Sequence, residues 1–167
     1  MTASKRKIFL IDGMALIYRA HYAMVYNQLT TSSGMHTSAI FGFVNSLLKI
    51  LNDEKPDFLA ICSDTKAPTF RHIRYDAYKA NRKPMPDELQ EQIPALYNIF
   101  EQSNIPLIKL DSYEADDVIG TIANSFDNKE NHIYIVSGDK DLMQLVNDST
   151  SVYSLGNKFK PTTIYNK

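Results

Sequence analysis

Residues 8–13 read Ile-Phe-Leu-Ile-Asp-Gly, four apolar residues followed at once by an acidic residue and a glycine. A short run that is apolar on both faces is typical of a strand buried inside a parallel sheet. The glycine that follows suits a tight turn at the end of such a strand. Similar runs occur at 58–62, 106–108 and 133–136, with a weaker fifth at 152–155. The sequence therefore predicts a sheet built of buried strands.

Longer segments with a helical spacing of apolar residues separate these runs, at 38–51, 87–102, 114–126 and 139–146. Alternating strands and helices predict an α/β fold, with a mainly parallel central sheet flanked by helices and right-handed crossovers. The length of 167 residues suits a single domain over 1–167, and residues 156–165 suggest a terminal hairpin. The helix at 38–51 is expected to bury a stripe made of Ile40, Phe43, Val44, Leu47, Leu48 and Leu51.

Composition excludes several classes of protein. The chain is 44% hydrophobic and 22% charged with a net charge of −1, as in ordinary globular domains. No apolar run approaches the roughly 18 residues that a membrane-spanning helix needs, so we expect no membrane partner. The single cysteine, Cys62, permits no internal disulfide, which fits a cytoplasmic location. A G-x-x-x-x-G-K-S/T phosphate loop is absent, which removes support for nucleotide-driven chemistry.

Acidic residues follow the predicted strands closely. Asp12 comes directly after the first strand, Asp64 two residues after the second, and Asp139 three residues after the fourth. Because the carboxyl ends of parallel strands share one edge of the sheet, where α/β folds place their sites, we expect these groups to converge. The candidate metal ligands are Asp12, Asp64, Glu114, Asp116, Asp117, Asp139 and Asp141.

Carboxylates gathered at one edge oppose each other's ionisation, and a hard divalent cation removes that conflict. Mg²⁺ prefers oxygen ligands and combines a few carboxylates with substrate phosphate. We therefore expect two Mg²⁺ ions, for which Mn²⁺ substitutes, and phosphodiester hydrolysis by a metal-activated water. Taken singly, Asp12, Glu114 and Asp139 also suit turns or helix caps, so the prediction depends on their convergence.

A basic segment precedes this acidic half of the chain. Residues 66–83 contain six Lys or Arg against one Asp, whereas residues 101–148 contain ten acidic residues against three Lys. If residues 70–83 form a helix, Arg and Tyr recur along one face, and such side chains can hold phosphates and stack on unpaired bases. The alternative is a surface helix whose tyrosines pack against the domain. The candidate nucleic-acid-binding residues are Arg71, Arg74, Tyr75, Tyr78, Lys79, Arg82 and Lys83.

Five strings of this sequence together resemble a known family. They are F-L-I-D-G at 9–13, T-F-R at 69–71, Y-K-A-N-R at 78–82, Y-E-A-D-D at 113–117 and S-G-D-K-D-L at 137–142. In this order they are similar to the 5′-nuclease domain of bacterial DNA polymerase I, over about residues 7–167. The resemblance implies a PIN-like, resolvase-like 5′-nuclease fold with a basic helical arch at about residues 66–86, through which a single-stranded 5′ end passes.

The resemblance also implies an activity. It is that of a divalent-metal-dependent 5′-3′ exonuclease and 5′-flap endonuclease, which hydrolyses DNA and RNA primers in replication and repair. Two alternatives stay open, a PIN-type ribonuclease with a similar acidic centre and a non-catalytic module that recognises branched DNA. The basic and aromatic segment favours the flap nuclease over the first, and the full set of carboxylates argues against the second. The residues expected to be catalytic are Asp12, Asp64, Lys79 and Arg82.

The family's S-D-N-I-P-G carboxylates, its helix-hairpin-helix region and its polymerase domain do not occur in the sequence up to Lys167. We therefore expect an N-terminal piece of a longer protein. Such a piece would hold one metal ion adequately and the second poorly, and it would cleave flaps weakly on its own. Ser63 also departs from the family pattern, which more often has an aromatic residue before the aspartate.

Overall fold

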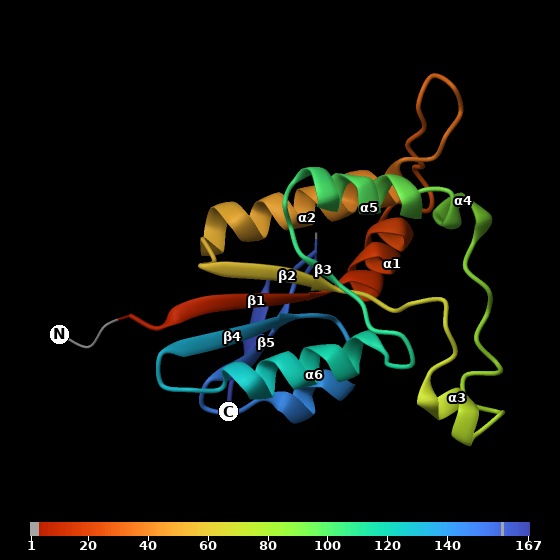
Figure 1. Cartoon of the computed structure of the whole chain (residues 1–167). Helices are drawn as coiled ribbons and strands as arrows, with labels where there is room; N and C mark the ends of the chain where they lie inside the picture. Colours follow the sequence, from red (N-terminus) through yellow and green to blue (C-terminus); the bar gives the residue numbers. More distant parts are fainter. Residues whose placement is uncertain (1–3, 158) are drawn as a thin grey trace.

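The computed structural model describes residues 4–157 and 159–167 as one six-stranded sheet with helices on both faces (Figure 1). The strands are β1 (Arg6–Asp12), β2 (Phe58–Cys62), β3 (Leu107–Ile108), β4 (Asn131–Val136), β5 (Thr150–Ser154) and β6 (Thr163–Tyr165). The helices are α1 (Gly13–Ala23), α2 (Ser38–Glu54), α3 (Phe70–Arg74), α4 (Asp87–Gln90), α5 (Ile93–Gln102), α6 (Ala115–Phe126) and the 3-10 helix η1 (Asp141–Leu145).

The strand order is β3-β2-β1-β4-β5-β6, and the neighbouring strands are parallel except β5 and β6. β1 is central, because Ile8 pairs with Phe58 of β2 on one side and with Ile133 of β4 on the other. This arrangement confirms the predicted α/β class with a mainly parallel sheet. The antiparallel pair of β5 and β6 forms the terminal hairpin.

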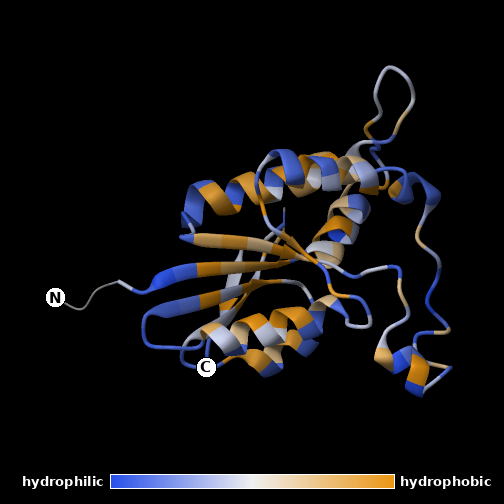
Figure 2. Ribbon diagram, in the orientation of Figure 1, coloured by the Kyte–Doolittle hydropathy of each residue, from blue (hydrophilic) through white to orange (hydrophobic). Residues whose placement is uncertain are grey.

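The central strand β1 divides the core into two halves, because successive side chains of a strand point to opposite faces. Phe9 and Ile11 pack with residues of α1, α2 and α5, whereas Ile8 and Leu10 pack with residues of α6 and η1. Figure 2 shows hydrophobic colour through the middle of the central strands. Burial on both faces fixes the strand, and with it the residue at its carboxyl end, Asp12.

The packing of α2 differs in part from the predicted stripe. Phe43 and Leu47 are buried, but Leu48 and Leu51 are 48% and 37% exposed. The buried face is completed by Ala39 and Ile50, which lie at helical spacing from Phe43 and Leu47. The apolar run at 47–51 covers more than one face, so periodicity alone misplaced its outer members.

Two predicted helices also need correction, and one helix was missed. The segment at 87–102 is two helices, α4 and α5, because Pro94 at the start of α5 has no N–H to continue the ladder from α4. The segment at 139–146 is the short 3-10 helix η1 rather than an α-helix. Helix α1 was not predicted, although Leu16, Ile17 and Ala20 recur on one buried face directly after Asp12.

The basic segment is helical only at α3, so the continuous helix predicted for 70–83 is wrong. From residue 75 to residue 86 the chain runs in turns and extended backbone, before it enters α4 (Figure 1). Lys79 has φ 57°, a left-handed conformation that a helix cannot continue through. The predicted spacing of Arg and Tyr along one helix face is therefore not realised beyond Arg74.

None of the helices in the described parts of the chain combines the length and the apolar character needed to cross a membrane.

Candidate metal and nucleic-acid site

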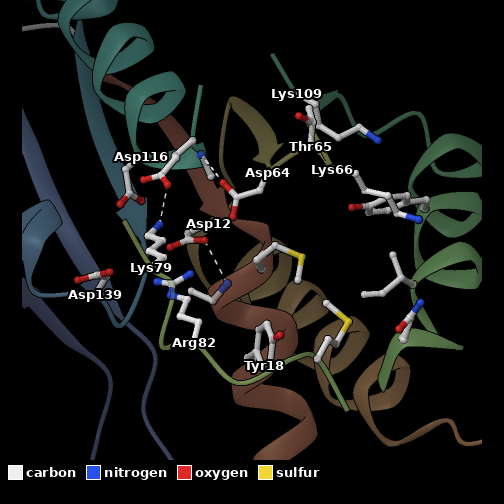
Figure 3. A pocket seen from close by; sticks show the side chains of 18 of the residues that line it. Asp12, Tyr18, Asp64, Thr65, Lys66, Lys79, Arg82, Lys109, Asp116 and Asp139 are labelled. Atoms are coloured by element: carbon white, nitrogen blue, oxygen red, sulfur yellow. Dashed lines mark hydrogen bonds and ion pairs between the residues drawn. The ribbon is translucent and has the colours of Figure 1, made fainter. Parts of the chain in front are cut away.

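Six carboxylates line one pocket of about 1220 Å³, and Asp111 and Glu114 are two of them. The other four lie together at the carboxyl edge of the sheet (Figure 3). Three of them follow strands: Asp12 ends β1, Asp64 follows β2, and Asp139 follows β4. The fourth, Asp116, lies in the first turn of α6. Figure 3 shows these four side chains around one space, with Lys79 and Arg82 projecting into it.

Asp12 is the most enclosed of the four, at 6% exposed. One carboxylate oxygen, Oδ1, accepts a hydrogen bond from the Ala15 N–H at 3.1 Å and so caps α1. Burial raises the pKa of Asp12; the hydrogen bonds from Ala15 and Ser137 oppose that rise, and the charges of Asp64 and Asp139 add to it. The carboxylate is thus held in place but costs free energy when it is ionised.

Asp64 connects β2 to helix α6. Its Oδ1 accepts a hydrogen bond from the Ala115 N–H at 2.7 Å, at the first residue of that helix. The bond satisfies one of the N–H groups left unpaired at a helix N-terminus, where negative charge is favoured. It also fixes the distance between the ends of β2 and α6, and so holds Asp116 near Asp64.

The pKa of Asp116 shows most clearly that these carboxylates affect one another's ionisation. Its pKa is raised to about 6, first by burial and then by the charges of Asp12, Asp139, Asp64 and Glu114. A carboxylate whose charge is opposed by four neighbouring acids is a natural ligand for a cation that would neutralise the group.

Asp139 lies in the loop that follows β4 and Asp141 begins η1, and both are exposed. The Asp139 N–H donates to Ser137 Oγ at 3.0 Å, and its Oδ1 accepts from the Asp141 N–H at 2.9 Å. Asp139 lines the pocket, whereas Asp141 starts η1 outside it. The structure therefore brings Asp139 to the other carboxylates and leaves Asp141 at the side.

Glu114 contacts the basic segment. Its Oε1 accepts from Lys79 Nζ at 2.7 Å, and its Oε2 accepts from the Tyr78 hydroxyl at 3.0 Å. Burial raises the pKa of Glu114, but these two hydrogen bonds and the charges of Lys79 and Arg71 outweigh it and lower the pKa overall. Glu114 lines the pocket at the point where basic and acidic residues meet.

The remaining basic candidates fall into two groups. Arg82 and Lys83 line the pocket, and Lys66 and Lys109, which the sequence did not single out, line it as well. Arg74 instead lies over the Phe70 ring, 5.9 Å from its centroid, outside the pocket. The last candidate, Tyr75, is 65% exposed.

Ser137 is the main contributor that sequence reasoning missed. Its hydroxyl donates to Asp12 Oδ2 at 2.8 Å and accepts from the Asp139 N–H. The S-G-D string drew attention to the aspartate, while the serine carried no chemical signal of its own. A helical periodicity after Asp12 could have placed Tyr18, another pocket residue, on α1.

The donor set fits a hard divalent cation, because carboxylate oxygens converge on the pocket and oppose each other's ionisation. Within residues 4–157 and 159–167, no group of three or more His, Cys, Asp or Glu side chains is already placed to enclose an ion. Mg²⁺ commonly keeps several waters and needs only one or two carboxylates together with substrate phosphate. An ion held here would therefore combine one or two of these carboxylates with waters and a substrate phosphate, without an all-protein cage.

Sequence comparison matches residues 7–167 to the family model described as the 5′-3′ exonuclease, N-terminal resolvase-like domain. The chain is 46% identical over 156 residues to DNA polymerase I of Caldicellulosiruptor bescii, covering 93% of this chain and 18% of that protein. It is 39% identical over 147 residues to a 5′-3′ exonuclease of Aquifex aeolicus, covering 88% of this chain and 50% of that protein. The chain thus spans half or less of these relatives.

Solved structures with the same fold have lower sequence identity. A bacteriophage T5 flap endonuclease, in a pseudo-enzyme-product complex with DNA and metal ions, superposes with a TM-score of 0.71 at 20% identity. The match covers 96% of this chain and 58% of the T5 protein. The catalytic core of Rad2 in complex with DNA substrate gives a TM-score of 0.54 at 17% identity, covering 98% of this chain and 48% of that one.

Proposed function

The chain belongs to the family of 5′-3′ exonuclease N-terminal, resolvase-like domains, and from that premise we propose that it is a divalent-metal-dependent 5′-3′ exonuclease and 5′-flap endonuclease. The proposed reaction is hydrolysis of a phosphodiester in DNA at or near a 5′ end. The convergence of Asp12, Asp64, Asp116 and Asp139 on one pocket, beside Lys79 and Arg82, is the observation that carries the proposal. Acidic groups for cations and basic groups for phosphate are what metal-assisted phosphoryl transfer requires.

We assign the principal ion to Asp116 and Asp139, with Asp12, Asp64 and Glu114 as further candidates for a pair of ions. Mg²⁺, or Mn²⁺ in its place, would lower the pKa of an attacking water and stabilise negative charge on the phosphate oxygens. Ser137 and the Ala15 N–H hold the Asp12 carboxylate in one orientation. The Ala115 N–H does the same for Asp64. Both carboxylates are therefore fixed in place before substrate arrives.

Lys79 and Arg82 supply positive charge to the same pocket. Lys79 Nζ lies 2.7 Å from Glu114 Oε1, so its ammonium group already points at the acidic centre. A phosphate entering the pocket would meet this ammonium group and the Arg82 guanidinium, and both would stabilise the negative charge of the transition state. Lys66 and Lys109 extend the positive lining outward, along a path for a single strand.

The wider assignments depend on the relatives. The arch segment at about 66–86 favours a substrate with an unpaired 5′ strand, and an RNA primer is proposed as a second substrate of the same pocket. Several relatives are DNA polymerases I that extend far beyond the matched region. A polymerase domain acting on the same DNA as this nuclease is part of the proposal.

The test is a 5′-labelled flap duplex incubated with Mn²⁺ or Mg²⁺, with EDTA as the metal-free control, run on this chain beside a longer form of the protein because the chain alone is expected to cleave weakly. Asp139→Asn is expected to lower cleavage by about a thousandfold, because losing an ion removes several kcal/mol of transition-state stabilisation. Asp148→Asn is the matched control, since this exposed aspartate pairs with Lys167 at the surface. Cleavage that prefers single-stranded RNA would instead support the ribonuclease. Flap binding without cleavage, with either ion, would support the non-catalytic module.

A further inference from the structure

The ion pair between Arg71 and Asp117 has a geometry unlike the other contacts of the basic segment. Arg71 Nη1 lies 2.6 Å from Asp117 Oδ2, and Nη2 lies 2.7 Å from Oδ1, so the guanidinium binds both oxygens in parallel. The two side chains are only 31% and 23% exposed. Such bidentate pairs are stronger and more directional than single charge contacts.

Asp117 has a second partner at the start of its own helix. Its Oδ2 also accepts a hydrogen bond from the Glu114 N–H at 3.0 Å, so the carboxylate helps to cap α6. Its neighbour Asp116 lines the pocket, whereas Asp117 lies outside it. Successive residues of a helix point about 100° apart, which follows from 3.6 residues per turn, so the two aspartates serve different sides of α6.

The other end of the pair is the first helix of the basic segment. Arg71 lies over the ring of Phe70, 4.5 Å from its centroid, and Phe70 packs on Tyr113 with 5.7 Å between ring centroids. The Phe70 N–H donates to the Ser112 carbonyl at 2.9 Å. Helix α3 is therefore joined to the start of α6 by packing, by one backbone hydrogen bond, by the bidentate Arg71–Asp117 pair and by a longer contact of Arg71 Nη1 with Glu114 Oε2 at 3.5 Å.

We propose that Asp117 is a positioning residue rather than a metal ligand, and that through Arg71 it fixes the base of the segment that carries Tyr78, Lys79 and Arg82. The proposal departs from the expectation that all seven acidic residues hold metal. The effect of this contact on substrate binding rests on the proposed function. A segment that is fixed at its base presents Lys79 and Arg82 to the substrate without first having to be ordered. If the base is loosened, the segment must be ordered when substrate binds, and the apparent affinity falls.

The test compares Asp117→Asn, Arg71→Gln and the double variant with Asp116→Asn as the matched control on the neighbouring residue of the same helix. Asparagine keeps an oxygen for the Glu114 N–H, so the cap is retained while the charge pair is removed. The first readout is the rate of limited tryptic cleavage after Arg74 and Arg82, measured against cleavage after the exposed Lys129 in the loop that follows α6. The second readout is Mn²⁺ affinity by calorimetry.

We expect cleavage within the basic segment to rise roughly fivefold in each single variant, with no further rise in the double variant, while cleavage at Lys129 stays constant. Mn²⁺ affinity should be retained by Asp117→Asn and abolished by Asp116→Asn. In flap cleavage, Asp117→Asn should raise KM and leave kcat near the wild-type value.

Loss of Mn²⁺ binding by Asp117→Asn with unchanged proteolysis would overturn the proposal, because Asp117 would then be a ligand. Equal acceleration at Lys129 and in the basic segment would also overturn it, because the pair would then act on global stability. The proteolysis and the calorimetry need no nucleic acid, so their results test the role of Asp117 whether or not the chain cleaves a flap. Absence of flap cleavage in the wild-type chain would count against the proposed function alone.

Discussion

The Ser137 hydroxyl donates a hydrogen bond to Asp12 Oδ2 at 2.8 Å and joins the carboxyl ends of the two central strands, β1 and β4. Ser137 Oγ also accepts a hydrogen bond from the Asp139 N–H, so one serine sets the position of two carboxylates that line the pocket. A hydroxyl can serve both bonds at once because it has one proton and two lone pairs.

Replacing this serine should therefore affect ion binding more than folding. Ser137→Ala leaves the buried Asp12 Oδ2 without its donor, which we expect to cost about 1.5–3 kcal/mol of stability and to weaken Mn²⁺ binding through the freed Asp139 loop. Thermal denaturation and calorimetry measure the two effects. Ser151→Ala is the control, since Ser151 is also buried and hydrogen-bonded but lies in β5 beside His132. Equal losses of Mn²⁺ affinity in both variants would contradict the assignment.

Asp116 should make the metal-free protein less stable as the pH rises. Its pKa is about 6 in the folded chain against an ordinary value of 3.8, so the folded state binds the proton more tightly than the unfolded state does. The resulting stability is fully present below about pH 3.8 and is lost as the pH rises through about 6. Asp116→Asn cannot ionise, so its melting temperature should exceed that of the wild type by a margin that grows across this range and then levels off. Thermal denaturation of both proteins in EDTA, at several pH values, measures this difference in melting temperature. A difference that does not change with pH would contradict the raised pKa of Asp116.

The basic residues of the pocket predict a change in salt dependence. The double variant Lys79→Ala with Arg82→Ala should weaken flap binding and make the slope of log K against log salt shallower, by about 0.7 for each phosphate that the variant no longer neutralises. Fluorescence anisotropy at several salt concentrations, without divalent ions, measures this slope. Arg74→Ala is the comparison, because Arg74 lies over Phe70 outside the pocket. A double variant with the wild-type slope would show that these side chains do not bind phosphate.

Two glycines should respond to alanine in opposite directions. A Cβ at Gly13 would lie 2.9 Å from Ile61 Cγ2 and 3.0 Å from the Cys62 carbonyl oxygen, so Gly13→Ala should cost about 1–3 kcal/mol of stability. A Cβ at Gly120 would meet only Leu145 at ordinary contact distance, and Gly120→Ala in the middle of α6 should add about 0.5–1 kcal/mol. Urea denaturation measures both, and a Gly13→Ala variant as stable as the wild type would mean that α1 can move away from β2 freely.

The sequence predicted the central strands β1 and β4 well because they are largely buried on both faces, and such strands read as unbroken apolar runs. It did less well with helices whose limits depend on single residues. Pro94 divides the helical pattern at 87–102, and the left-handed backbone of Lys79 ends any helix that could have extended from Phe70. The helix break at Pro94 and the positive φ of Lys79 do not change the spacing of apolar residues, so that spacing cannot reveal them.

The candidate site, too, could be predicted only in part from the sequence. That Asp12, Asp64 and Asp139 would share one edge followed from the parallel strands that precede them. Which acids pair with basic side chains of the protein did not follow, because the pairing of Asp117 with Arg71 depends on how the chain turns after β2. Long-range side-chain contacts of this kind are set by tertiary packing, which one sequence does not encode in a local pattern.

Because β1 lies between β2 and β4, the set of carboxylates in the pocket can be completed only late in the synthesis of the chain. Asp12 and Ser137 are 125 positions apart, and Asp139 reaches its neighbours only when β4 pairs with β1. A growing chain from which β4 has not yet emerged lacks Asp139, so its pocket cannot hold all four carboxylates. The set is complete only when β4 pairs with β1. With the pocket as the proposed nuclease site, a ribosome-bound chain surrounded by RNA therefore lacks the complete site until most of the domain has been made.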